Sequence, residues 1–379
     1  MSAGWTALVA VAFAFATGCG RIGFSEVAVN GGDGDATTVT LIPALSTINV
    51  GSKVELVADG GVPPYELALV GEGSLTGTTF VAPTRAGESL VSATDSLGRS
   101  ATATIRYRGE RLFVVGGLVG GTAVPTVLSS EDGAIWTSLG ALPAARANGA
   151  LVVYDDRMFY LGGLNAGGAP TNEVFSSTDG VTWTQVGTLP ITNTGFTSIV
   201  HRGAMWIVGG ATGAGDGVDT YHSTDGATWT AAAKIAGPRH EHDLISDGDT
   251  LYVLGGHGGA LLDDVQSTTD GTAWSPRGAV LTFTADFAAA AQLDDRVVRI
   301  CGAGCTATES STDLVTWTPG ANLPAMRESP GLVAFGGRLL VIGGGSTAVL
   351  ATTDGSSWPT VGTLPDARVR TAAVQFTPR

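Results

Sequence analysis

One short pattern recurs six times within residues 109–379 of this 379-residue chain. Each copy has an apolar run that ends in a pair of glycines, as in LFVVGG at 112–117 and MWIVGG at 205–210. The first position of the pair falls at 116, 162, 209, 255, 301 and 343, which gives steps of 46, 47, 46, 46 and 42 residues. In the fifth copy Cys301 takes the place of the glycine. A period of this length predicts a closed or stacked array of repeated units.

A second landmark runs in phase with the first, because each copy also has an aspartate followed four residues later by a tryptophan. The six pairs are Asp132 and Trp136, Asp179 and Trp183, Asp225 and Trp229, Asp270 and Trp274, Asp313 and Trp317, and Asp354 and Trp358. Asp-Gly steps favour tight turns between strands. A four-stranded blade cannot bury both faces alone, so we expect one tryptophan per copy to fill the space between neighbouring blades.

The tryptophan is followed by a Pro-x-x-Arg or Pro-Arg segment in four copies, which contain Arg146, Arg239, Arg327 and Arg368. The order of these three landmarks, a glycine pair, then a tryptophan and then an arginine segment, resembles the repeat of the kelch family. The resemblance covers residues 109–379 and implies a six-bladed kelch-like β-propeller, but no particular activity. We expect TAAVQF at 371–376 to supply the innermost strand of the first blade and so close the ring.

Residues 38–108 contain short alternating runs separated by turn residues, which predict a small antiparallel β-sandwich. The segments GGVPPY at 60–65, FVAP at 80–83 and DSLG at 95–98 resemble bacterial immunoglobulin-like modules. That resemblance implies a spacer domain. The predicted fold class is therefore all-β, with a small immunoglobulin-like β-sandwich before a six-bladed kelch-like β-propeller.

The N-terminus has the features of an export signal. Residues 3–18 are apolar but shorter than the roughly 20 residues of a membrane span, so we interpret 1–18 as a signal peptide. The segment Ala16-Thr17-Gly18-Cys19 resembles a bacterial lipobox, which implies lipidation of Cys19 and a membrane anchor. An ordinary secretory peptide with an unmodified Cys19 is the alternative. Residues 19–37, rich in Gly and Asp, are predicted to form a flexible tether.

These features predict an exported protein of the bacterial cell envelope, an outer-membrane lipoprotein or otherwise a secreted protein. The formal net charge is −14 and the 20 basic residues are scattered, so we expect no nucleic-acid partner. We expect a monomer. Cys301 and Cys305 form a disulfide or remain two free thiols.

In kelch-like blades, the segment that enters the innermost strand and the loop after the glycine pair open near the mouth of the central channel. When the positions of the kelch pattern are matched to this sequence, the resemblance places a set of ligand-binding candidates at the mouth: Arg146, Asn148, Arg239, His240, His242, Arg327 and Arg368. It places Glu328 and Arg370 beside them, and Asn165 and His257 on neighbouring loops. Converging arginines in an acidic protein favour a carboxylate or a carbohydrate ligand. The alternative is that each arginine packs against the adjacent blade and holds loop carbonyls.

His240, Glu241 and His242 are the densest group of metal-ligand residue types, with His257 as a third imidazole. The kelch pattern itself accounts for His242, so we assign no metal and no cofactor. The chain has no nucleophile elbow, phosphate-binding glycine loop or isolated carboxylate pair. We therefore predict a non-enzymatic surface protein that recognises a protein or carbohydrate. The alternative is an extracellular polysaccharide-active hydrolase or lyase that uses the channel mouth.

Overall fold

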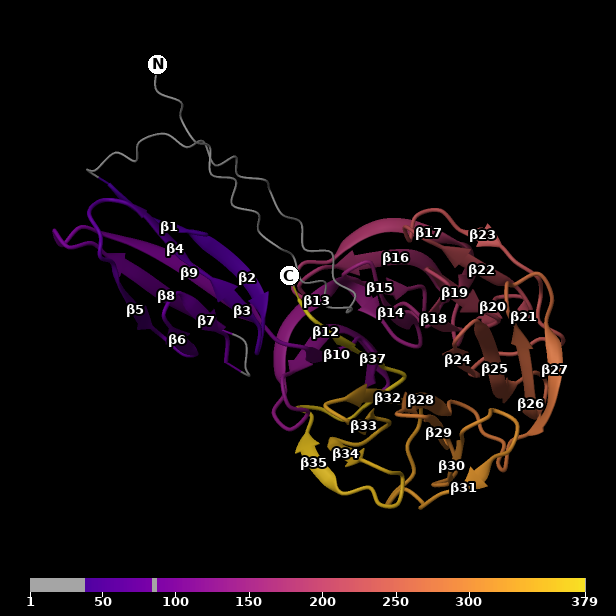
Figure 1. Cartoon of the computed structure of the whole chain (residues 1–379). Coiled ribbons are helices and arrows are strands. Elements are labelled where there is room, and N and C mark those ends of the chain that lie inside the picture. The colour runs from indigo at the N-terminus through magenta and orange to yellow at the C-terminus, as the bar shows by residue number, and fades with distance from the viewer. Residues whose placement is uncertain (1–37, 84–86, 379) are drawn as a thin grey trace.

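The computed structural model describes residues 38–83 and 87–378. Every regular element in these ranges is a β-strand, which confirms the all-β prediction. The strands form an elongated N-terminal part that ends at Arg108 and a rounded part that begins at Arg111 (Figure 1). The described residues contain no helix of the length and apolarity needed to cross a membrane.

The N-terminal part has one larger sheet and two smaller ones. The larger sheet consists of β2 (Leu45–Asn49), β9 (Ser100–Arg108), β8 (Gly87–Thr94) and β5 (Glu66–Val70) in that order. The smaller sheets consist of β3 (Lys53–Glu55), β7 (Thr79–Val81) and β6 (Ser74–Thr76), and of β1 (Val39–Ile42) and β4 (Val57–Gly60). Strand β2 runs parallel to β9. The core of this part contains Leu56, Phe80 and Ile105, which have no exposed surface.

Two of the segments singled out in the sequence meet at Asp95. Its carboxylate accepts hydrogen bonds from the backbone N–H of Val62 at 2.9 Å and of Leu97 at 3.0 Å, and it pairs with Arg99 at 2.7 Å. Burial opposes the charge on Asp95, but these hydrogen bonds outweigh it and lower the pKa to about 2. Asp95 therefore joins the GGVPPY segment to the DSLG turn.

The rounded part has six sheets of four main strands among the described residues. In the first sheet the order is β37 (Ala372–Phe376), β10 (Arg111–Val115), β12 (Thr122–Ser130) and β13 (Thr137–Arg146), with β11 (Leu118–Val119) and β36 (Arg368–Val369) as an extension. The second is β14 (Ala150–Tyr154), β15 (Arg157–Leu161), β16 (Thr171–Ser177) and β17 (Thr184–Asn193). The third is β18 (Thr197–His201), β19 (Ala204–Val208), β22 (Thr220–Ser223) and β23 (Thr230–Ala231), next to the small hairpin of β20 (Ala211–Thr212) and β21 (Gly215–Asp216).

The last three sheets repeat this order. The fourth is β24 (Asp243–Asp247), β25 (Thr250–His257), β26 (Leu261–Thr268) and β27 (Ser275–Val280). The fifth is β28 (Ala289–Leu293), β29 (Arg296–Ile300), β30 (Thr308–Ser311) and β31 (Thr318–Pro319). The sixth is β32 (Pro330–Phe335), β33 (Arg338–Gly343), β34 (Ala348–Thr352) and β35 (Thr360–Thr363).

The first-named strand of each sheet lies near the centre of the rounded part and the last-named strand lies at its rim (Figure 1). Each central strand contacts the central strands of two other sheets, and β37 contacts both β14 and β32. The core is divided into apolar clusters that each join two neighbouring sheets. One such cluster joins the sixth sheet to the first through Leu340, Ile342, Leu112 and Val114. This arrangement is propeller-like.

The C-terminal strand lies where the sequence predicted it. Strand β37 pairs antiparallel with β10, and Phe376 lies opposite Arg111. The run ATATIRY belongs to β9 in the N-terminal part instead, so β37 is the central strand of the first sheet. These pairings confirm that residues 371–376 form the inner strand of the sheet that contains β10.

A turn precedes each tryptophan, and in most repeats this turn has the same hydrogen-bond pattern. In the second repeat Ser177 Oγ donates to Asp179 Oδ1 at 2.9 Å and accepts from the N–H of Gly180 at 2.8 Å. Asp179 Oδ1 also accepts from the N–H groups of Val181 and Thr182, each at 2.8 Å. The turn delivers Trp183 into the apolar cluster between the first and second sheets, as predicted for the tryptophans.

Candidate ligand-binding site

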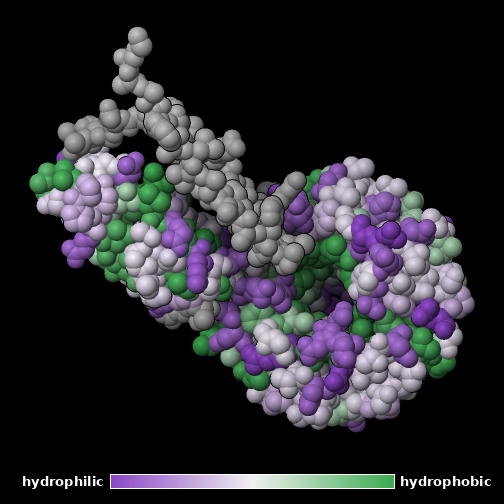
Figure 2. All heavy atoms as spheres, viewed as in Figure 1, coloured by the Kyte–Doolittle hydropathy of each residue, from purple (hydrophilic) through white to green (hydrophobic). Residues whose placement is uncertain are grey.

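Six residues with left-handed backbone surround the centre of the rounded part. Each repeat places one of them shortly before its central strand: Asn148 (φ 53°), Gly195 (φ 63°), Glu241 (φ 56°), Phe287 (φ 55°), Ser329 (φ 52°) and Arg370 (φ 54°). Non-glycine residues rarely adopt this conformation, so its recurrence indicates a backbone geometry imposed by the fold. All six line one cavity of about 310 Å³. We call these residues the mouth ring. On the face seen in Figure 2, hydrophilic residues lie around the hollow near the centre.

Backbone hydrogen bonds connect part of the mouth ring directly. The N–H of Asn148 donates to the carbonyl of Arg370 at 2.9 Å, and the N–H of Gly195 donates to the carbonyl of Asn148 at 3.1 Å. The N–H of Glu241 then donates to the carbonyl of Gly195 at 2.5 Å. The backbone of these residues is therefore fixed from one repeat to the next, and the repeats differ mainly in the side chain they present to the cavity.

Glu241 is the one member of the mouth ring with a carboxyl group. Its side chain is 10% exposed, and a Cβ placed on Gly195 would lie 3.3 Å from Glu241 Cγ. Burial raises the pKa of Glu241 to about 8, and the charge of Asp286 adds to the effect, whereas Arg370 and a hydrogen bond from Asn148 oppose it. The carboxyl group can therefore donate as well as accept hydrogen bonds at neutral pH.

Arg370 is the cation of the ring, and Phe287 is its aromatic member. The guanidinium carbon of Arg370 lies 4.7 Å from the centroid of the Phe287 ring, within the range of a cation–π contact. Its Nε is 3.8 Å from Glu328 Oε1 and is buried without a hydrogen-bond partner. A planar donor group and an aromatic face thus lie side by side in the cavity wall.

The four arginines predicted from the sequence are all buried, with at most 4% exposure. Three of them donate from Nη1 to the carbonyl of the first glycine in the next repeat: Arg239 to Gly255 at 3.0 Å, Arg327 to Gly343 at 2.9 Å and Arg368 to Gly116 at 3.0 Å. Arg146 pairs with Glu173 of the next sheet at 3.1 Å. This geometry favours the alternative given for these arginines, in which they hold the carbonyls and side chains of an adjacent sheet.

The remaining predicted residues separate into different environments. Asn148 and Arg370 line the cavity, whereas Asn165 Oδ1 accepts hydrogen bonds from the N–H groups of Gly167 and Ala169 and so stabilises its own loop. The imidazole of His242 is buried, which lowers its pKa to about 3, and neither ring nitrogen has a hydrogen-bond partner. His240 lies beside His257, and their ring centroids are 5.1 Å apart.

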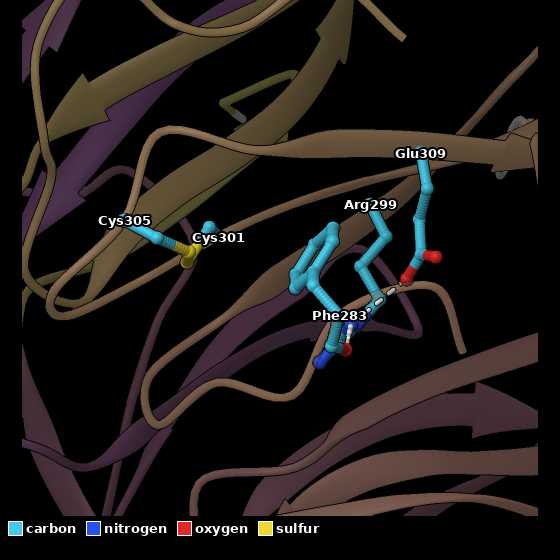
Figure 3. Close-up of a disulfide and its surroundings, with 5 residues drawn as sticks. All are labelled: Phe283, Arg299, Cys301, Cys305 and Glu309. Carbon is cyan, nitrogen blue, oxygen red and sulfur yellow. Dashed lines mark hydrogen bonds and ion pairs between the residues drawn. A yellow bond between two sulfur atoms is a disulfide. The ribbon is translucent and has the colours of Figure 1, made fainter. Parts of the chain in front are cut away.

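Cys301 and Cys305 are joined by a disulfide, with a Cα–Cα distance of 5.8 Å (Figure 3). This separation is within the usual range for a disulfide. Cys301 is fully buried at the end of the fifth repeat's second strand. Of the two alternatives left by the sequence, the structure therefore contains the disulfide.

Four members of the mouth ring were not among the residues predicted for the channel mouth, namely Gly195, Glu241, Phe287 and Ser329; Glu241 was named only as a potential metal ligand. A signal for them was present in the repeats. When the copies are aligned, the position of Arg146, Arg239, Arg327 and Arg368 is nearly constant, and the second repeat has Asn193 there. The side-chain amide of Asn193 donates to the carbonyl of Gly209 at 2.8 Å, as the arginines do to equivalent glycines. Two residues later, every repeat has a different residue, and that variable position lines the cavity.

No family model matches the chain, and no curated protein matches it. Among solved structures, one titled "Structure of YjhT" is similar to this chain at 15% sequence identity. The match covers 66% of this chain and 96% of that chain, with a TM-score of 0.53. The likeness supports a β-propeller-like fold. At this identity it carries no information about ligand or activity.

Proposed function

We propose that the protein is an exported, surface-anchored binding protein and that the mouth ring of a six-bladed kelch-like β-propeller binds a carbohydrate. The observation that carries the ligand proposal is the cavity of about 310 Å³ lined by six different residues, five of them with a side chain and one a glycine, at one repeated backbone position. A fold that fixes the backbone and varies the side chain is suited to recognition, because the variable groups alone determine what fits.

The architecture in this proposal rests on the order of the sheets. The six four-stranded sheets correspond to six blades, and the contacts of β37 with β14 and β32 support a ring closed between its ends. The glycine, tryptophan and arginine landmarks support the kelch-like assignment. The sheets of residues 38–108 are consistent with an immunoglobulin-like spacer.

Export is supported by the disulfide between Cys301 and Cys305, because disulfides persist mainly in oxidising compartments. The predicted signal peptide, the tether and lipidated Cys19 lie outside the described residues, so the anchor is carried by the sequence alone. The membrane partner in this proposal is the lipid on Cys19. A mature species that begins at an acylated Cys19, recovered from membranes and identified by intact mass, would support the anchor; an unmodified soluble species would refute it.

The chemistry of the mouth ring favours a carbohydrate over a protein partner. A stable protein interface buries roughly 800 Å² of surface on each partner, which is more than the wall of a small cavity offers. The volume of this cavity, about 310 Å³, is at the small end of the range for sites that bind small molecules. Asn148, Glu241 and Arg370 supply directional donors and acceptors for hydroxyl groups. Phe287 supplies an apolar face against which the C–H side of a sugar ring can pack.

The polysaccharide hydrolase or lyase stays as the second proposal, and one observation favours it. The charge of Asp286 adds to the effect of burial in raising the pKa of Glu241, which indicates that a second carboxyl group lies near the one in the mouth ring. Carboxyl pairs that flank a glycosidic bond are the usual machinery of glycoside hydrolysis. A binding protein and an enzyme of this kind would share a ligand class and differ in turnover.

The test is a carbohydrate array probed with the full-length protein, followed by calorimetric titration of each sugar that binds. We expect Asn148→Ala and Arg370→Ala each to weaken binding by about tenfold, since each removes a hydrogen bond worth roughly 1–3 kcal/mol in a partly buried site. The matched control is Arg277→Ala, because Arg277 also lies over an aromatic ring, that of Tyr252, but on the outer strand β27.

The outcomes separate the proposals. Equal affinity of Arg370→Ala and Arg277→Ala would exclude the mouth ring as the binding site. Release of shorter sugars by the wild type, and its loss in Glu241→Gln, would establish the enzyme in place of the binding protein. An array with no bound sugar would refute the carbohydrate proposal altogether.

A further inference from the structure

A second group of polar side chains lies beside the mouth ring and has no role in the proposal above. The group consists of Asp216 at the end of β21, His240 before β24 and His257 at the end of β25. Each residue offers one potential ligand atom, and these three atoms all lie within 4.8 Å of one another. Among the described residues this is the one such group of three or more histidine, cysteine or acidic residues. We call it the Asp–His–His group.

The two histidines are held together by the backbone. The N–H of His240 donates to the carbonyl of His257 at 2.9 Å, and the N–H of His257 donates back to the carbonyl of His240 at 2.9 Å. Their rings are inclined at 56° and are not stacked. The backbone at both histidines is therefore fixed before any ligand arrives, which reduces the entropy lost on binding.

The hydrogen bonding of the group is incomplete in a way that points to a ligand. The Nδ1 of His257 is buried without a hydrogen-bond partner. The Nδ1 of His240 lies 2.9 Å from Asp216 Oδ1, yet that contact lacks hydrogen-bond geometry, so this nitrogen also has no hydrogen-bond partner. Buried polar atoms without partners cost free energy. A cation that accepts electron pairs from both nitrogens and from the carboxylate would satisfy all three.

We propose that the Asp–His–His group is a zinc site. Two imidazole nitrogens and one carboxylate oxygen are a ligand set that Zn²⁺ accepts at about 2.0–2.2 Å, with a water in the fourth position. In a tetrahedral site with such bonds the ligand atoms lie roughly 3.4 Å apart, so the more distant atoms of the group need to approach by up to about 1.4 Å, and the contact of 2.9 Å between Asp216 and His240 needs to open slightly. Asp216 lies on the short hairpin of β20 and β21, which can supply that movement without disturbing a main sheet.

A neighbouring carboxyl group completes the surroundings of the site. Glu241 Oε2 lies 3.8 Å from His240 Nε2, and histidines that bind a metal through one nitrogen commonly direct the other at a carboxylate. From the sequence we grouped His240 and His257 with His242, and we assigned no metal because the kelch pattern accounts for His242. The structure instead buries His242 against Gly209 and brings Asp216 to His240.

The test is a calorimetric titration of metal-free, full-length protein with Zn²⁺. We expect one Zn²⁺ per chain, and we expect Asp216→Asn and His257→Gln each to weaken binding at least about tenfold. The matched control is His222→Gln, because His222 stacks on Trp206 at 4.9 Å and belongs to no such group. Circular dichroism of each variant without metal establishes that it is folded.

X-ray absorption of the zinc-loaded wild type keeps the proposal testable even if a variant fails to fold. The expected spectrum has two imidazole ligands with nitrogen at about 2.0–2.1 Å and no sulfur at about 2.3 Å. A sulfur shell, an absence of Zn²⁺ binding, or equal affinity in wild type and His257→Gln would each overturn the site. The three ligand residues of the zinc site, Asp216, His240 and His257, are not members of the mouth ring, so loss of zinc binding in His257→Gln with unchanged sugar binding would separate the two proposals.

Discussion

At the scale of single residues, Arg299 shows how the fold tolerates a buried charge. It has no exposed surface, and it donates from Nε to Asp243 at 3.0 Å and from Nη1 to Glu309 at 2.9 Å. Its guanidinium lies 4.6 Å from the ring of Phe283 (Figure 3). Burial raises the pKa of Asp243, and the charge of Arg299 opposes that shift. The arginine therefore compensates two carboxyl groups from two sheets.

We expect Arg299→Met to destabilise the protein by about 3–5 kcal/mol, because it leaves two buried carboxyl groups without their cation. Urea unfolding followed by tryptophan fluorescence measures the change. The control is Arg296→Met on the same strand, where the lost bond is one to the carbonyl of Asp354 at the surface. That control should change stability by less than about 1 kcal/mol. Equal losses in the two variants would mean that the ion pairs contribute no net stability.

At the scale of elements, the fifth repeat departs from the others in three coupled ways. Cys301 replaces the first glycine of the pair, and unlike Gly116 or Gly343 it does not have a positive φ. Ala285 occupies the position of the inter-sheet arginine, and Arg299 donates to the carbonyl of Phe283 nearby. The disulfide to Cys305 then holds the loop that the glycine pair forms elsewhere.

The turns before the tryptophans are the most uniform element of the chain. In all six of them, backbone N–H groups donate to the aspartate, and these hydrogen bonds are the largest cause of the lowered pKa of Asp132, Asp225, Asp270, Asp313 and Asp354. At Asp179 burial opposes the charge, but the same hydrogen bonds outweigh it. For Asp313, donors from Thr316 and Val315 lower the pKa to about 2.

These aspartates predict a stability that falls in acid. A carboxyl group whose pKa is lower in the folded protein stabilises it above the unfolded pKa of about 3.9, and this contribution disappears as the pH falls through the folded value. We expect a melting temperature that is level from pH 7 to about 5 and drops between about pH 4 and 2. Asp313→Asn should lower it at pH 7 and leave it nearly unchanged at pH 2, measured by differential scanning calorimetry.

The control for this prediction is Asp249→Asn, at an exposed aspartate outside these turns. It should not alter the pH profile. A profile for Asp313→Asn that parallels the wild type at every pH would show that the charge of the turn aspartate does not stabilise the fold.

The same elements show what a sequence of this kind can and cannot predict. The glycine pairs, the tryptophans and TAAVQF predicted the strands, the packing between sheets and the last strand, because each depends on a local pattern repeated in register. Arg239 did not reveal its role, because the sequence does not say whether its side chain turns toward the cavity or toward Gly255. Asp216 and His257 are 41 residues apart, and nothing local relates them. Only the folded chain brings them together.

At the scale of the whole molecule, the two ends of the rounded part are joined by one short segment. Strand β37 pairs with β10, and Arg368 donates to the carbonyl of Gly116 while its own carbonyl accepts from the N–H of Gly345. Phe376 packs on Phe113, with ring centroids 6.0 Å apart. The last residues therefore connect the sixth sheet to the first, more than 250 residues earlier in the chain.

We expect deletion of residues 371–379 to lower the free energy of unfolding by several kcal/mol, because removing Phe376 from its cluster alone costs roughly 3–5 kcal/mol. It also leaves β10 without its inner partner, and an unpaired edge at the centre exposes backbone groups that were hydrogen-bonded. The matched control deletes 377–379, which keeps β37 and removes the bond from Arg108 to the carbonyl of Pro378, worth roughly 1 kcal/mol. Urea midpoints and limited proteolysis of the two chains compare them. If the shorter chain kept the midpoint of the control, the six sheets would be stable without the C-terminal strand, and its pairing with β10 would contribute little to the stability of the molecule.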